Sequence, residues 1–171
     1  MKTIKNNLKS EAVYDDNETR RYSLHLEWQK DLKRACVIML KAGKTDGISF
    51  DRTTNFVLEN LSELGFGSGD ILNLFSSLNG GFDDEDKDNL KAIESACKNA
   101  DTVIFAVGTG HKMNKKVITR QKEVIAILKN HSDKLLCIAD DEGQKFYHPL
   151  CPKVQKWNLV NFDVKEIDES D

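Results

Sequence analysis

The chain has 171 residues, of which 39% are hydrophobic and 31% charged, and its formal net charge at pH 7 is -3. This composition is typical of one folded domain spanning residues 1–171 and excludes a largely disordered chain. No apolar run approaches the roughly 20 residues that a membrane span needs, and the first residues lack the apolar core of a secretory signal. We therefore expect a cytoplasmic protein that does not contact a membrane.

The first part of the chain predicts a β-hairpin. Residues 1–11 show no periodicity and predict a frayed lead-in. After the short run Ala12 to Tyr14 and the turn-rich segment DDNETR, apolar and polar residues alternate through YSLHLEW. This alternation is typical of a strand with one buried face.

The rest of the chain alternates short apolar runs with segments of helical period. The apolar runs predict strands at 35–40, 70–75, 102–107 and 135–139. The segments between them predict helices, the first capped by Asp51 and ended by Gly65. A β-α-β-α-β-α-β order predicts an α/β fold: a three-layer α/β/α sandwich with a central, mainly four-stranded parallel sheet. The acidic end, 165–171, predicts a mobile tail.

The carboxyl ends of the predicted parallel strands are the expected place for a ligand, because open sheets bind ligands where the strand order reverses. Lysines and histidines gather in the loops there, among them Lys41, Lys44, His111 and Lys112. A basic rim of this kind suits a phosphate-bearing ligand or a nucleic-acid strand. The alternative is a set of solvated surface lysines.

Two glycine-containing loops follow predicted strands. Gly43-Lys44-Thr45 resembles the end of a P-loop, but the P-loop spacing needs a glycine at Ile38, inside the strand. Gly108 opens the sequence GTGHK, which either cradles a phosphate or forms a tight turn.

His148 is the first of two candidate catalytic residues. The following Pro149 restricts it to extended geometry, so its ring has a defined direction and can serve as an acid, a base or a donor to an oxyanion. Asp46, the second candidate, is the carboxylate nearest the end of the first parallel strand and suits the orientation of a water. A structural histidine and a turn residue before Gly47 are the alternatives.

Further candidates are Asn73, whose amide suits a base or a sugar, and Phe50, whose ring suits stacking on a base. Their alternatives are a bond to the neighbouring backbone and a place in the core. His148 and Cys151 are the only hint of metal ligands, and with Cys36 and Cys137 inside predicted strands we expect no metal site. No motif predicts a cofactor.

Several of these motifs, in this order, resemble the bacterial and phage family catalogued as domain of unknown function 1643. They are RRYSLHLEW, VIML followed by Asp46, Asp51 with Thr53, the NLF of 73–75, Gly108, and Gly143 through His148-Pro149-Leu150. The resemblance extends from about Arg20 to Trp157. The family has no assigned reaction. Its Asn-Pro-Ser-Thr segment corresponds to 41–44 here, and its tryptophan-glycine pair to Val107-Gly108.

The layout is also similar to that of the uracil-DNA glycosylase superfamily. That resemblance implies a water-activating role for Asp46, base contacts for Phe50 and Asn73, and closure of the site by the His148 loop. Base release would also require a base flipped into a pocket and a stabilised anionic leaving group.

Together these observations predict a nucleic-acid- or nucleotide-binding protein of glycosylase-like architecture, in phage or mobile-element DNA metabolism, with catalysis left open. One alternative is a hydrolase or glycosylase that acts on a base or nucleoside through Asp46 and His148. Another is a non-catalytic protein-interaction module that uses the acidic run 83–88 or the acidic tail. The sequence leaves the oligomeric state open.

Overall fold

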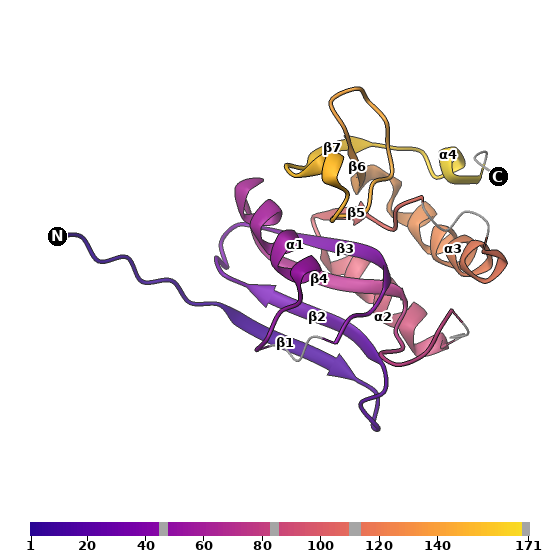
Figure 1. Ribbon diagram of the computed structural model, residues 1–171, viewed down its shortest axis with the longest axis horizontal. Coiled ribbons are helices and arrows are strands. Elements are labelled where there is room, and N and C mark those ends of the chain that lie inside the picture. The colour runs from indigo at the N-terminus through magenta and orange to yellow at the C-terminus, as the bar shows by residue number, and fades with distance from the viewer. Residues whose placement is uncertain (45–47, 83–85, 110–113, 169–171) are drawn as a thin grey trace.

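The computed structural model describes residues 1–44, 48–82, 86–109 and 114–168. Its described part is a mixed α/β structure with one seven-stranded sheet in the order β1-β2-β4-β3-β5-β6-β7 (Figure 1). The strands are β1 (Lys9–Tyr14), β2 (Arg21–Glu27), β3 (Lys33–Lys41), β4 (Phe66–Phe75), β5 (Thr102–Phe105), β6 (Leu135–Ala139) and β7 (Asn158–Asn161). The helices are α1 (Arg52–Glu63), α2 (Lys87–Asn99), α3 (Lys115–Leu128) and α4 (Lys165–Asp168).

The predicted N-terminal hairpin is present. β1 and β2 pair antiparallel from Lys9 with Glu27 to Tyr14 with Arg21. The Asp15 carboxylate closes the turn by accepting hydrogen bonds from the backbone N–H groups of Thr19 and Arg20, both at 2.7 Å. β1 already begins at Lys9, so the irregular lead-in is shorter than the predicted 1–11.

Four of the strands are parallel neighbours. β3 pairs with β4 on one side and with β5 on the other, and β6 continues the parallel pairing from β5. β2 and β7 add antiparallel strands at the two flanks. The chain runs from β3 outward to β4 and then returns past β3 to β5, so the strand order reverses between β3 and β5.

β4 is longer than predicted, because Gly67 and Gly69 indicate a turn in the sequence but lie inside the strand. A Cβ at Gly67 would lie 1.9 Å from the carbonyl oxygen of Gln29, and one at Gly69 would lie 2.6 Å from the Leu61 side chain. The two glycines therefore allow the strand to pass close to its neighbours, which is the usual reason for glycine in a strand interior.

Each face of the sheet carries its own apolar cluster. α1 buries Val57 and Leu61 against one face, which we call the α1 face. α2 and α3 bury residues such as Ile93 and Val124 against the other, the α2/α3 face. The predicted cap of α1 is confirmed, since Asp51 accepts a hydrogen bond from the Thr54 N–H at 2.7 Å. The Asp51 side chain also lies against Gly43, so the start of α1 is beside the segment that follows β3.

The C-terminal part contains two elements that the sequence did not predict. β7 pairs antiparallel with β6, and Phe162 and Val164 after it lie in the α2/α3-face core. The predicted mobile tail of 165–171 begins instead with α4, whose Ile167 is only 6% exposed. Apolar side chains scattered among acids anchor this segment without giving a periodic pattern. In the described part of the chain, no helix combines the length and apolarity that a membrane crossing requires.

Candidate functional site

A cavity of about 390 Å³ lies beyond the carboxyl ends of β3, β5 and β6. This is the edge at which the strand order reverses, and its volume is within the range of ligand pockets. Its walls come from the end of β3 and from the segments after β5 and β6: Leu40, Val107, Gly108, Thr109, Phe146, Tyr147, His148 and Cys151. We call this space the edge cavity.

Gly108 and His148 both line the edge cavity and lie close to each other. Gly108 has φ +81°, and a Cβ at that position would lie 2.9 Å from the Cβ of His148. Glycine is therefore required for two separate reasons, the left-handed backbone and the close approach. The contact joins the segment after β5 to the segment after β6.

Asp140 shapes the segment that carries His148. Its Oδ1 accepts hydrogen bonds from the N–H groups of Glu142 and Gln144, at 3.1 and 2.8 Å, while the Tyr147 hydroxyl donates to Oδ2 at 2.7 Å. The bond from Tyr147 is the main cause that lowers the pKa of Asp140, and it raises the pKa of Tyr147 to about 12. Phe146, with φ +67°, is held in a backbone conformation that non-glycine residues seldom adopt.

The ring of His148 has a defined tautomer. The Leu150 N–H donates to His148 Nδ1 at 3.2 Å, and the Cys151 N–H donates to the His148 carbonyl at 2.9 Å. A nitrogen that accepts a hydrogen bond carries no proton, so in the neutral ring the proton is on Nε2. In the neutral ring of His148, Nε2 is therefore the nitrogen that carries the proton.

A second polar group lies at the same edge, where β2 meets β4. The Arg21 side chain is 2% exposed and that of Asn73 1% exposed, and Arg21 Nη2 donates to Asn73 Oδ1 at 3.4 Å. Asn73 has the same parity along β4 as Ile71, which is part of the α1-face core. The pair is therefore on the α1 face, near the start of α1.

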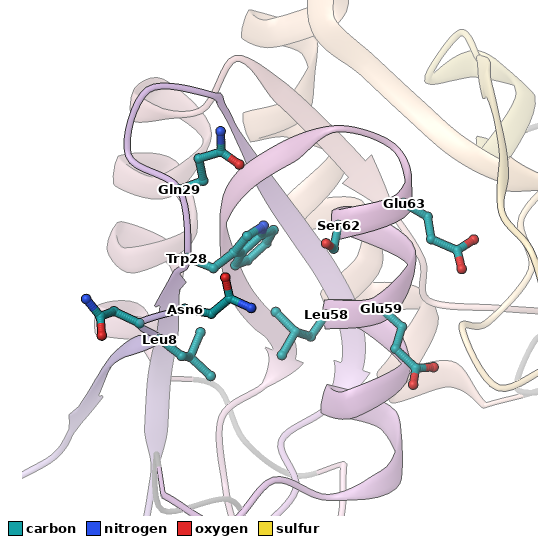
Figure 2. A pocket seen from close by; sticks show the side chains of 9 residues that line it. Asn6, Leu8, Trp28, Gln29, Leu58, Glu59, Ser62 and Glu63 are labelled. Atoms are coloured by element: carbon teal, nitrogen blue, oxygen red, sulfur yellow. The ribbon is translucent and has the colours of Figure 1, made fainter. Parts of the chain in front are cut away.

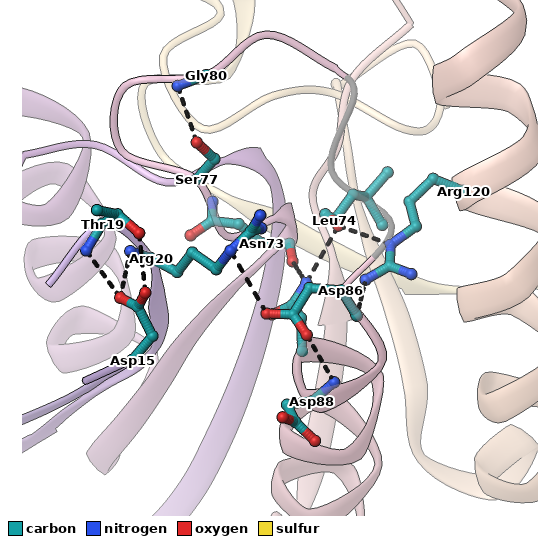
Figure 3. A network of polar contacts seen from close by, with 11 residues as sticks. Asp15, Thr19, Arg20, Asn73, Leu74, Ser77, Gly80, Asp86, Asp88 and Arg120 are labelled. Carbon is teal, nitrogen blue, oxygen red and sulfur yellow. Dashed lines mark hydrogen bonds and ion pairs between the residues drawn. The ribbon is translucent and has the colours of Figure 1, made fainter. Parts of the chain in front are cut away.

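On the α2/α3 face the carboxyl end of β4 is held by side chains that bond to backbone carbonyls (Figure 3). Arg120 donates from Nε to the Leu74 carbonyl and from Nη2 to the Asp86 carbonyl, both at 2.9 Å. Asn89 donates to the carbonyls of Asn73 and Leu74, at 2.9 and 3.1 Å. These bonds fix α2 and α3 to the end of β4.

A larger hollow, of about 680 Å³, lies at the opposite edge of the sheet (Figure 2). Trp28 lies in it between the N-terminal segment and the last two turns of α1, which contribute Leu58, Glu59, Ser62 and Glu63. The Trp28 N–H donates to the Gly67 carbonyl at the start of β4, which places this amino-edge groove away from the carboxyl ends of the parallel strands.

Of the residues predicted from the sequence, Gly108 and His148 line the edge cavity. Asn73 lies at the same edge but is bonded to Arg21, and Phe50 is half-buried against the α1-face core. Lys44 is exposed, as is Lys41, whose Nζ donates to the Gly80 carbonyl. Ile38 is fully buried inside β3, so the position of the first P-loop glycine is part of a strand and not of a loop. Asp46, His111 and Lys112 are outside the described residues.

Sequence reasoning missed Arg21, Phe146 and Tyr147. Arg21 precedes an alternating strand, and its arginine-arginine dipeptide gives no sign of which side chain is buried. The positive φ of Phe146 leaves no trace in the sequence either. The one available signal was the sequence that starts at Asp140 and reaches Gly143 directly after a predicted strand, because aspartate and glycine are typical of turns. It indicates the turn that leads to Tyr147.

The described residues contain no group of three or more histidine, cysteine or acidic side chains that could hold a metal ion. The family model described as Protein of unknown function (DUF1643) matches residues 21–150, which is more than half of the chain. The chain belongs to this family. The DUF1643 region begins at Arg21 and includes His148, so it contains both polar groups of the carboxyl edge. No curated protein and no solved structure matches the chain.

Proposed function

We propose that this DUF1643 protein binds a nucleic acid or nucleotide at the carboxyl edge of its sheet. Its architecture would then be the three-layer, uracil-DNA-glycosylase-like sandwich, and its role would be in phage or mobile-element DNA metabolism. The observation that carries the proposal is the edge cavity, which lies where the strand order reverses and has Gly108 and His148 close together in its wall.

A nucleobase fits the chemistry of this cavity. A base has apolar faces and polar edges, and the cavity combines the aromatic side chains of Phe146 and Tyr147 with the Nε2–H donor of His148. Aromatic rings stack on bases of any sequence, while one fixed donor selects an acceptor at the base edge. The arrangement therefore favours recognition of an unpaired base.

Titration of labelled single- and double-stranded DNA and of free nucleotides, at low and high salt, tests the proposal. We expect binding that weakens with salt, because phosphate contacts release counterions, and that is stronger for single strands. His148→Ala should weaken it. The matched control is His131→Ala, since His131 lies in the 3₁₀ turn Lys129–Lys134 before β6, at the opposite edge. Absence of binding at low salt would refute the proposal.

A second candidate is a hydrolase or glycosylase that acts on a base or nucleoside. The observation that favours it is the His148 tautomer, because Nε2–H can donate to the oxygen of a departing base and stabilise its negative charge. On this hypothesis Asp46 positions the attacking water. His148→Ala and Asp46→Asn should then both abolish release of free base, measured by chromatography over a panel of modified DNA and nucleosides. An inert wild-type protein across the panel would count against catalysis.

The acidic-surface alternative has less support among the described residues. Asp86 accepts from the Asp88 N–H at the start of α2 and pairs with Arg20, and Asp88 pairs with Lys91. These acids already have partners within the chain. A role in protein binding stays a prediction.

A further inference from the structure

The Arg21–Asn73 pair has buried hydrogen-bond donors without acceptors. Arg21 Nε and Nη1 and Asn73 Nδ2 are all buried, and none has a partner in the described chain. Among the described residues, Arg21 makes one side-chain hydrogen bond, the long one to Asn73 Oδ1 at 3.4 Å. Buried donors are nearly always paired in folded proteins, so three of them in adjacent side chains require an explanation.

The pair also carries a positive charge that the surrounding protein neutralises only from a distance. Burial lowers the pKa of the Arg21 guanidinium, and the nearby Tyr14 and Asp51 oppose this effect without forming an ion pair with it. A guanidinium nevertheless remains charged at neutral pH. A buried charge of this kind is unfavourable unless something of opposite charge reaches it.

Arg120 shows what a structural arginine in this fold looks like. It is 4% exposed, and each of its three side-chain nitrogens has an acceptor: the carbonyls of Leu74 and Asp86, and the carboxylate of Glu123. Arg21 is as deeply buried, but two of its nitrogens have no acceptor in the described part of the chain. Among the described residues, none supplies the acceptors that Arg21 lacks.

We propose that Arg21 and Asn73 bind the phosphate group of the nucleotide whose base occupies the edge cavity. The set consists of donors alone, and the planar guanidinium matches the oxygens of a phosphate in a two-pronged fashion. This inference rests on the proposed nucleotide-binding function. It extends that function by placing the phosphate of the nucleotide at the Arg21–Asn73 pair.

The position of the pair agrees with this assignment. Arg21 is on β2, and β4 and β3 separate it from β5, beside whose end the edge cavity lies. Three strand spacings of about 4.8 Å put the two groups about 14 Å apart along one edge. A nucleotide that places its base in the cavity extends its phosphate along this edge. Because the pair is buried, binding requires side-chain movement, which commonly accompanies association.

Calorimetric titration with a nucleoside, its 5′-monophosphate and inorganic phosphate tests the inference. We expect the monophosphate to bind the wild-type protein about tenfold to a hundredfold more tightly than the nucleoside, as charge-assisted bonds provide. In Arg21→Met this preference should vanish while affinity for the nucleoside stays unchanged. Arg21→Lys keeps the charge without the fork and should retain part of the preference. His148→Ala should weaken nucleoside binding and leave the preference intact.

The matched control is Arg20→Met, because Arg20 pairs with Asp86 and precedes Arg21 in the chain. It should keep the full preference. Equal affinity of the wild-type protein for nucleoside and monophosphate would refute the phosphate site alone, whereas no binding of any nucleotide or nucleic acid would refute the proposed function as well. A thermal melt provides an independent measurement: inorganic phosphate should raise the melting temperature of wild type above that in chloride of equal ionic strength, but not that of Arg21→Met. An equal rise in both proteins would overturn the inference.

Discussion

The carboxyl end of β4 has a buried arginine on each side, and the two arginines differ in how their nitrogens are paired. On the α2/α3 face, Arg120 reaches backbone carbonyls and a carboxylate with all of its nitrogens. On the α1 face, Arg21 is equally buried, but two of its nitrogens find no acceptor among the described residues. A cation whose hydrogen bonds are complete within the chain holds elements together, whereas one with open hydrogen bonds indicates a ligand. Pairing therefore separates the structural arginine from the one that we propose as a ligand contact, although burial alone does not distinguish them.

The largest effect should come from Arg120→Met. The substitution removes the hydrogen bonds from Arg120 to the carbonyls of Leu74 and Asp86. These carbonyls lie where β4, α2 and α3 meet. Loss of two such partners should lower the free energy of unfolding by about 3 kcal/mol. Urea unfolding followed by circular dichroism measures this. A change below about 1 kcal/mol would show that these hydrogen bonds do not hold α2 and α3 to β4.

Gly108→Ala should have the next largest effect. The added Cβ meets both a left-handed backbone and the Cβ of His148, so we expect a loss of about 2 kcal/mol or more and weaker ligand binding. Gly65→Ala is the matched control, because Gly65 also has φ +81° but no atom lies within 4 Å of the added Cβ. Its cost should be near 1 kcal/mol, from the backbone alone. Equal losses in the two variants would contradict the close contact across the edge cavity.

A smaller effect is expected in the pH dependence of stability. The hydrogen bond from Tyr147 lowers the pKa of Asp140, so the folded protein binds fewer protons at this carboxyl than the unfolded chain does. The stabilisation is complete above the unfolded pKa, near 4, and is lost as the pH falls through the lowered folded pKa. Tyr147→Phe should therefore reduce stability at pH 7 more than at pH 2. Urea midpoints of both proteins at the two pH values would test it, and a constant difference between them would refute the coupling.

The smallest change in stability is expected for Arg21→Met. The methionine removes a buried charge that lacks an ion-pair partner, so the free energy of unfolding should change by less than about 1 kcal/mol or increase. Urea unfolding of Arg21→Met and Arg120→Met under the same conditions measures the difference between the two arginines directly. If Arg21→Met lowered the free energy of unfolding as much as Arg120→Met does, both arginines would have a structural role.

Much of the fold was predictable because its signals are local. The apolar run of β6 and the Asp51 cap of α1 are periodic or positional features that sequence alone reveals, and both are confirmed. Gly67 and Gly69 misled the prediction because a glycine inside a strand, required by a neighbouring chain segment, has the same sequence as a glycine in a turn. β7 was missed because its register depends on β6 rather than on its own pattern.

The site was predictable only in part. Gly108 and His148 follow strand ends, and the rule that ligands bind beyond the carboxyl ends of parallel strands brings them together. The role of Arg21 depends on which donors are left unpaired after folding, and no periodicity encodes that. Asn73 lies at this edge, where the sequence places it, but its bond to Arg21 joins residues 52 positions apart. Such long-range pairs become visible in three dimensions alone.

The central claim is that ligands bind at the carboxyl edge and not in the larger amino-edge groove, and residue-specific NMR tests it most directly. Titration of a ¹⁵N-labelled sample with a short single-stranded oligonucleotide should shift the backbone amide of Gly108 and the ring nitrogens of His148. The indole Nε1–H of Trp28, in the amino-edge groove, should not move. Shifts at Trp28 with Gly108 and His148 unchanged would contradict the account.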